Sequence, residues 1–415
     1  MPSVTRHAVA LASALLLCAL SSAGCSLVEA PKPVSCSWTG SGQTASTAGA
    51  ASNTVVLIDT SASFWPRKGG SASRPDSQQE AAAELLRDFG QAGTQLVSLG
   101  TFNGTSTTIS WQLADTPLPT PAGTADAISR QRDGEKTCLD QVIGRAEQTA
   151  PPVGGTDVMA ALDAAGTKLG STGADRSEVL VITDGLSNTG CLNLNQVMSQ
   201  GENATDVVRS CRGQGGLAQL RGVSVKLAGI GLQAQAKPLT SSEQSWLVDY
   251  WRELCSVLRV AAAPSCVMSQ GDTSTDGSDV GRPSDPPVSF PVVTGPVVVV
   301  PAPLLFAFDS SVLTPAAQAY LDILIQQIRG SGQSVTRIVG HTDRAGSAAY
   351  NLGLSQRRAQ AVQSYLAARG FTGIKASGVG FSQPACPSDY TPSGQLNPRC
   401  MAKDRRVVIF LGGHK

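Results

Sequence analysis

The sequence SVTRIVGHTD at residues 334–343, followed by YNLGLSQRRA at residues 350–359, decides the fold of the C-terminal part of this chain. Its first seven residues alternate in polarity, which predicts a strand. From 348 to 369 the apolar residues recur at helical spacing, which predicts a helix whose apolar stripe contains Leu354, Ala361, Val362, Tyr365 and Leu366. We therefore expect Asp343 just beyond the end of a strand and Arg358 on the helix that follows.

Asp343 and Arg358 are together suited to bind a zwitterion that carries an ammonium group beside a carboxylate. The aspartate can accept hydrogen bonds from the ammonium, and the arginine can donate two parallel N–H bonds to the carboxylate, which a lysine cannot do. For either residue alone, the alternative is structural. Asp343 then caps the following turn, and Arg358 is a solvated helix residue.

The motif GHTD at 340–343 resembles the signature of OmpA-like peptidoglycan-binding domains. The resemblance extends over about Val297 to Leu411, because FAFDSSVL at 306–313 and DRRVVI at 404–409 match the first-strand and last-strand signatures of that family. It implies a small α+β domain that binds the diaminopimelate of peptidoglycan stem peptides. The implied binding residues are Asp343, Arg358, Ser310, Ser311, Thr342, and Arg405 or Arg406, with the choice between the two arginines left open.

A second group of polar residues lies in the first half, where the apolar run TVVLI (54–58) ends in DTSAS (59–63). An uninterrupted apolar run of this kind predicts a buried parallel strand. GGTD at 154–157 precedes an apolar helix, and a second buried strand, VLVI at 179–182, runs into TDG. Three polar loops thus follow or precede apolar elements in a fixed order.

Together these three stretches resemble a von Willebrand factor A domain. The resemblance implies a metal-ion-dependent adhesion site at the carboxyl ends of the sheet strands, where open α/β sheets bind ligands. The matching residues are Asp59, Ser61, Ser63, Thr156 and Asp184. Oxygen ligands without histidine or cysteine suit Mg²⁺ and disfavour zinc. Because only two of them are carboxylates, the ion would stay electrophilic and accept a carboxylate from a protein partner. The alternatives are that DTSAS caps a helix after a strand, or that the fold carries no metal.

The first half alternates strands and helices, which predicts an α/β fold with a doubly wound, mostly parallel sheet. Two strands are expected to end at Asp59 and at Ile182, and three more to span 95–102, 106–113 and 223–230. The expected helices span 78–89, 134–147, 157–169 and 242–258. Residues 185–212 are expected to be a loop-rich insertion. It either overhangs the metal site or forms a disulfide-bound surface loop.

The N-terminus is typical of an exported protein. Residues 1–24 combine a short basic start with an apolar stretch, which predicts a signal peptide rather than a transmembrane helix. The end of this stretch resembles a lipobox, which implies that Cys25 becomes the lipid-modified first residue of the mature chain. Plain secretory cleavage near Ala23 is the alternative, because Ser22 stands where a lipobox usually has leucine. Serine at position 26 favours the outer membrane, if the organism has one.

Composition divides the remaining chain into four parts. Residues 25–52 are expected to form the lipid anchor and a polar spacer, 53–268 the von Willebrand factor A-like domain and 297–415 the OmpA-like domain. Residues 269–296 begin with a stretch that is rich in Gly, Ser, Asp and Pro and lacks an apolar period, so they are predicted to be a flexible linker. The two domains are thus expected to be tethered rather than fused.

The cysteines fit export. Cys18 is expected to be removed with the signal peptide and Cys25 to carry the lipid, so eight cysteines remain. An even number of cysteines in an exported chain predicts disulfide bonds. Cys386 and Cys400, the two in the C-terminal domain, are expected to pair. The other six allow several connectivities. Proximity favours Cys191 with Cys211 and Cys255 with Cys266, which leaves Cys36 for Cys138; the alternative is that some stay reduced and buried.

The net charge and the motifs that the sequence lacks exclude some classes of function. The formal net charge is +1, and no basic run is interleaved with aromatic residues, so nucleic acid is not an expected partner. The sequence has three histidines and no nucleophile-elbow, Walker or HExxH motif, so we expect no enzyme. We predict an envelope protein, attached to the membrane through its lipid anchor only, that binds peptidoglycan and, through Mg²⁺, an unidentified protein ligand. The alternatives are a purely structural membrane-to-wall tether and an outward-facing adhesin.

Overall fold

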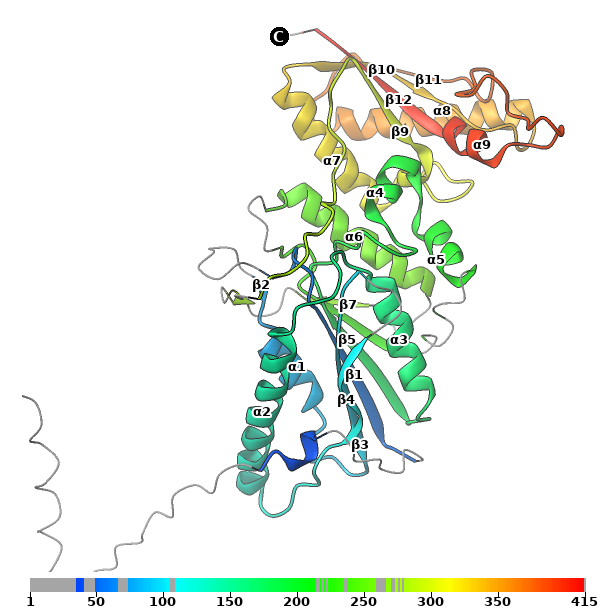
Figure 1. Ribbon diagram of the computed structural model, residues 1–415. Coiled ribbons are helices and arrows are strands. Elements are labelled where there is room, and N and C mark those ends of the chain that lie inside the picture. Colours follow the sequence, from blue (N-terminus) through cyan, green and yellow to red (C-terminus); the bar gives the residue numbers. More distant parts are fainter. Residues whose placement is uncertain are drawn as a thin grey trace, which may run out of the picture. The chain divides into compact units, whose positions relative to one another are not determined.

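The computed structural model describes residues 35–40, 49–65, 74–104, 109–213, 217, 220, 223–233, 238–258, 266–269, 273–274, 277 and 280–413. Residues Cys36–Lys415 form one compact unit. Strands and helices are mixed throughout this unit, which confirms the predicted α/β class (Figure 1). The predicted signal peptide and Cys25 lie outside the described residues. In the part that is described, no helix is both long and apolar enough to cross a membrane.

A six-stranded sheet forms the centre of the first half. Its order is β4-β3-β1-β5-β6-β7, and all neighbouring strands are parallel except β3 and β4. All residues of β1 are buried, as the uninterrupted apolar run predicted. The strands are β1 (Ser52–Asp59), β3 (Gln95–Phe102), β4 (Ser110–Pro117), β5 (Arg176–Ile182), β6 (Ser224–Ala228) and β7 (Val267–Ser269), and a short antiparallel pair joins β2 (Arg74–Pro75) to β8 (Thr273–Ser274).

Helices cover both faces of this sheet (Figure 1). Because side chains alternate along a strand, Val56 and Ile58 of β1 pack in one core with α1 and α2, whereas Val55 and Leu57 pack in a second core with α3, α5 and α6. The helices are α1 (Ser77–Leu85), α2 (Ala125–Glu147), α3 (Val158–Gly170), α4 (Leu194–Gln196), which a π-helical turn (Val197–Gly201) continues, α5 (Ala204–Gly213) and α6 (Ser241–Leu258).

Three expectations for this half were wrong. The strand expected at 106–113 lies later in the chain, at Ser110–Pro117 (β4). Helix α2 begins at Ala125 rather than at residue 134, because Thr124 caps it by accepting a hydrogen bond from the backbone N–H of Ala127. The insertion 185–212 is not mainly loop, since it contains α4 and most of α5. Helix α5 buries Val207 and Val208 on one face.

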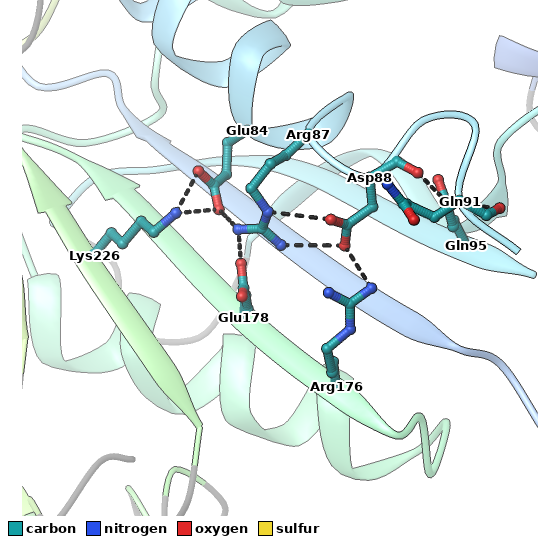
Figure 2. Close-up of polar contacts among 8 residues, drawn as sticks. All are labelled: Glu84, Arg87, Asp88, Gln91, Gln95, Arg176, Glu178 and Lys226. Carbon is teal, nitrogen blue, oxygen red and sulfur yellow. Dashed lines mark hydrogen bonds and ion pairs between the residues drawn. The ribbon is translucent and has the colours of Figure 1, made fainter. Parts of the chain in front are cut away.

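A cluster of charged side chains ties the end of α1 to the sheet (Figure 2). Glu84 of α1 pairs with Lys226 of β6 at 2.8 Å, and Arg87 pairs with Glu178 of β5. Asp88 continues the cluster to Arg87 and Arg176, at 3.3 and 3.0 Å. Most of these groups are largely shielded from water, so they fix the position of α1 more firmly than isolated surface pairs do.

The C-terminal half is built on a four-stranded sheet of order β11-β10-β12-β9. Strand β10 pairs in parallel with β11 and antiparallel with β12, which in turn pairs antiparallel with β9. The strands are β9 (Val297–Pro301), β10 (Ser334–Gly340), β11 (Lys375–Gly378) and β12 (Arg406–Gly412); the α-helices are α7 (Pro315–Gly330), α8 (Ala348–Ala367) and α9 (Pro398–Asp404), with a 3-10 turn at Ala302–Leu304. The strand and the helix predicted around GHTD are therefore β10 and α8.

The stretch 306–313 is not a strand, which corrects the first-strand prediction. It is a loop closed by an isolated bridge between Phe306 and Leu313, and the first strand of this half is β9. Asp309, at the turn of the loop, has a φ of 56°, a left-handed conformation that interrupts extended backbone.

Gly340, the last residue of β10, lets the strand approach α8 closely. A Cβ atom at this position would lie 2.2 Å from the carbonyl oxygen of Ser355. A side chain there would push the helix away, so glycine sets the spacing between the loop after β10 and the helix that carries Arg358.

Four disulfide bonds join the cysteine pairs favoured by the sequence. They are Cys36–Cys138, Cys191–Cys211, Cys255–Cys266 and Cys386–Cys400. The first closes a loop with a sequence separation of 102, so it restricts the unfolded chain most.

Candidate functional sites

The end of β1 places a buried carboxylate among hydroxyl groups. Asp59 is 0% exposed. Its Oδ1 accepts a hydrogen bond from the backbone N–H of Ser61 at 2.9 Å, and its Oδ2 accepts one from Oγ1 of Thr183 at 2.7 Å. The hydroxyl oxygens of Ser61 and Ser63 lie 3.1 Å apart. Thr183 follows β5, the parallel neighbour of β1, so the two strand ends meet at this point.

The other two loops contribute buried oxygens that lack hydrogen-bond partners. The backbone N–H of Thr156 donates to Oδ1 of Asn188 at 2.9 Å, and Oδ1 of Asp184 accepts from the backbone N–H of Leu186 at 2.9 Å. In the described part of the chain, Oγ1 of Thr156 and Oδ2 of Asp184 have no partner. Unsatisfied buried oxygens cost free energy, and a bound cation is one group that would satisfy them.

Electrostatics at this position favour a cation. Burial raises the pKa of Asp59 to about 7. Burial, and next the charge of Asp59, raise the pKa of Asp184 well above its usual range. Two carboxyl groups that destabilise each other's ionised form are a donor set that a divalent ion would stabilise. Over the described residues, no group of three or more His, Cys, Asp or Glu side chains could hold a metal. Hydroxyl oxygens would thus have to complete the ligand set, and hard oxygen donors fit Mg²⁺.

The loop after β10 holds the second carboxylate that the sequence singled out. Asp343 is 8% exposed and lines a pocket. Its Oδ2 accepts from Nη1 of Arg405 at 2.7 Å, and its Oδ1 accepts from the backbone N–H of Ala345 at 3.0 Å. An ionised carboxylate has about four acceptor positions, so Asp343 retains room for a ligand ammonium.

Arg358 of α8 lies in the same pocket and is 6% exposed. Its Nε donates to the carbonyl oxygen of Ser310 at 2.8 Å, and its guanidinium carbon lies 5.3 Å from the centre of the Phe306 ring. Among the described residues its two terminal nitrogens donate no hydrogen bond. Burial lowers the pKa of this guanidinium. Arg358 is therefore held at Nε, while its terminal nitrogens are available to a carboxylate ligand.

The comparisons with known proteins identify a family for the part of the chain that contains Asp343 and Arg358. The model of the OmpA family matches residues 305–393. The outer membrane protein A of Citrobacter freundii is 35% identical over 171 residues, which are 34% of this chain and 71% of that protein. The chain belongs to the OmpA family.

Other relatives match a similar share of the chain. The outer membrane protein A of Shigella flexneri is 36% identical over 155 residues, or 36% of this chain, and the chain spans only 44% of its length. The solved peptidoglycan-associated lipoprotein of Burkholderia pseudomallei is 27% identical, with a TM-score of 0.21, and the match covers 26% of this chain and 88% of that one.

The OmpA-family site contains most of the residues predicted for it. Ser310, Thr342, Asp343, Arg358 and Arg405 line the pocket, whereas Ser311 and Arg406 are not part of its lining. Arg406 instead donates to the carbonyl oxygen of Gln383 at 3.0 Å. Of the two arginines that the sequence left open, it is thus Arg405 that meets Asp343.

His341 of the same motif does not take part in the pocket. It is buried, and burial, followed by the positive charge of Arg406, lowers its pKa to about 4. The ring is therefore neutral at neutral pH.

Several neighbours of the two sites were missed from the sequence. In the OmpA-family site, the hydroxyl of Tyr350 donates to Asp309, and Nδ2 of Asn351 donates to the carbonyl oxygen of Ala345 at 2.8 Å. In the first half, Thr183 and Asn188 support Asp59 and Thr156. Most of them lie inside or next to the quoted motifs, so proximity in sequence was the available signal.

Proposed function

We propose that the OmpA-family part of the chain binds peptidoglycan without a covalent bond, through the diaminopimelate of its stem peptides. The observation that carries this proposal is the pairing, in one pocket, of Arg358, whose terminal nitrogens are available, with Asp343, whose carboxylate has room for an ammonium. A guanidinium can bind a carboxylate through two parallel N–H bonds, and the aspartate can accept from the adjacent ammonium. The match to a family of outer membrane proteins supports the same function.

The ligand can be tested with purified sacculi. We expect the mature chain to sediment with sacculi whose stem peptides carry diaminopimelate, and free diaminopimelate to compete. Sacculi with lysine at that position keep the ammonium but lack the adjacent carboxylate, so we expect at least about tenfold weaker binding, in line with the loss of one charge-assisted bidentate contact. Equal binding to both kinds of sacculi would rule out recognition of the zwitterion.

We further propose that the first half is a von Willebrand factor A-like domain with a metal-ion-dependent adhesion site. The sheet order and the unsatisfied oxygens of Thr156 and Asp184 support this assignment. Asp59, Ser61, Ser63, Thr156 and Asp184 would hold the ion. A bound Mg²⁺ would supply an open coordination position for the carboxylate of a protein partner.

A pull-down from envelope extract tests whether this site has a protein ligand. We expect the mature chain to retain a partner in Mg²⁺ and to lose it in EDTA. Asp59→Ala removes one of the two carboxylates and should give the EDTA result even in Mg²⁺. The same proteins in every lane would favour the purely structural tether.

We also propose that the protein is exported and held in the outer membrane by a lipid on Cys25, so that it joins that membrane to the wall. The signal-like and lipobox-like sequences support this proposal. An adhesin would instead face outward, and protease added to intact cells would then cleave it. We propose no enzyme activity.

A further inference from the structure

The residues that precede the C-terminal half cross the loops of the metal site. In this 280–289 segment, Arg282 donates from Nε to the carbonyl oxygen of Thr60 at 3.0 Å and from Nη2 to that of Glu147 at 2.6 Å. Its guanidinium carbon also lies 4.8 Å from the centre of the Trp65 ring. Arg282 thus fixes the start of the segment beside the loop that follows β1.

The other end of the 280–289 segment is fixed beside the loop that follows β5. Nδ2 of Asn188 donates to the carbonyl oxygen of Pro286 at 2.8 Å, and Nδ2 of Asn195 donates to that of Pro287 at 3.0 Å. The backbone N–H of Ser289 donates back to Oδ1 of Asn195 at 2.9 Å. Asn188 is also the residue that binds the backbone of Thr156.

Between these two attachments, Asp285 points its carboxylate at the metal-site loops. Its Oδ2 accepts from the backbone N–H of Ser63 at 2.7 Å, and its Oδ1 accepts from the backbone N–H of Gly155. Burial is the main cause of the raised pKa values of Asp59 and Asp184. The negative charge of Asp285 raises both pKa values further, by a smaller amount. The carboxylate therefore lies within electrostatic reach of both proposed metal-binding carboxylates.

Gly154 allows this close approach. A Cβ atom at Gly154 would lie 2.2 Å from the carbonyl oxygen of Ser284, the residue before Asp285. Any other residue at this position would force the backbone of the segment away from the loop. The GGTD stretch thus admits the 280–289 segment as well as contributing Thr156.

We propose that the carboxylate of Asp285 occupies the place on the metal-site loops that the carboxylate of a partner must take, so that a partner has to displace it. This inference rests on the proposed metal-dependent function. Asp285 has the same chemistry as the acidic side chain of a partner and belongs to the same chain, so its effective concentration is high. Weak carboxylate ligands are excluded, and a partner succeeds only through further contacts.

The inference can be tested with Mn²⁺ and acetate as probes. Mn²⁺ prefers the same oxygen ligands as Mg²⁺, and it broadens the methyl proton signal of acetate that binds next to it. With the full mature chain at equal Mn²⁺ loading, measured by electron paramagnetic resonance, we expect little acetate broadening in the wild type. Asp285→Asn should bind acetate on the order of tenfold more tightly, because the competing ligand is removed.

Two further variants sharpen this experiment. Asp175→Asn removes one exposed negative charge just before β5, at the opposite end of that strand, and should behave like the wild type. Asn195→Ala keeps Asp285 but removes two bonds that hold the 280–289 segment, so its acetate broadening should fall between wild type and Asp285→Asn.

The outcomes separate the inference from the function on which it rests. Equal acetate broadening in wild type and Asp285→Asn, at equal loading, would overturn the role of Asp285 and leave the metal site intact. If neither protein bound Mn²⁺, the proposed metal site would fail, and the inference with it.

Discussion

Lysine in place of Arg358 should remove most of the binding to diaminopimelate-type sacculi, although it preserves the positive charge. An ammonium cannot donate two parallel bonds to a carboxylate, and it cannot keep the Nε bond to Ser310 while it reaches the ligand. Loss of a charge-assisted contact of this kind costs about 1.5–3 kcal/mol. The dissociation constant from a sedimentation isotherm should therefore rise roughly ten- to hundredfold.

The neighbouring residue provides a matched control for this substitution. Arg357 is exposed on the same helix and does not line the pocket. Arg357→Lys should therefore bind sacculi like the wild type. Asp343→Ala, which removes the partner of the ligand ammonium, should lose binding as Arg358→Lys does. Thermal unfolding of each variant checks that it is folded, and wild-type affinity in a folded Arg358→Lys would show that the guanidinium does not bind the ligand carboxylate.

The fold was predictable where the apolar pattern of the sequence was strong. The strand ending at Asp59 and the helix after GHTD were predicted within a few residues. The strand is a short, uninterrupted apolar run, and the helix repeats its apolar side chains at helical spacing. The start of α2 was missed because its first turns are polar and depend on the cap at Thr124. Strand β7 was missed because three residues are too few to show a period.

The candidate sites were predictable only in part, for a related reason. Motifs identify residues that are close in sequence, such as Asp59, Ser61 and Ser63. The approach of Arg405 to Asp343 depends on how β12 pairs with β10, which motif spacing does not give. The contact of Asp285 with Ser63 joins residues 222 positions apart, in a stretch whose composition suggested only a linker.

Asp184 is the residue whose substitution should most clearly reveal a metal site. Asp184→Asn keeps the shape of the side chain and an oxygen that can accept from the backbone of Leu186. It removes one of two buried carboxyl groups, each of which disfavours the ionised form of the other. Without metal, we expect the variant to unfold at a higher temperature than the wild type, with a gain on the order of 1 kcal/mol. Burial in the folded state no longer opposes the ionisation that a carboxyl group undergoes freely in the unfolded chain.

Magnesium should reverse this order. At a concentration one hundredfold above its dissociation constant, an ion that binds only the folded state stabilises it by about 2.7 kcal/mol. Calorimetry should show this increase for the wild type, and EDTA should abolish it. Asp184→Asn, which lacks one of the two carboxylates that would hold the ion, should respond little. Asp343→Asn makes the same chemical change in the other site and should keep the full response. If Mg²⁺ did not stabilise the wild type, or if it stabilised Asp184→Asn equally, the buried carboxyl pair would not be a metal site. The first half would then be a spacer in a structural tether.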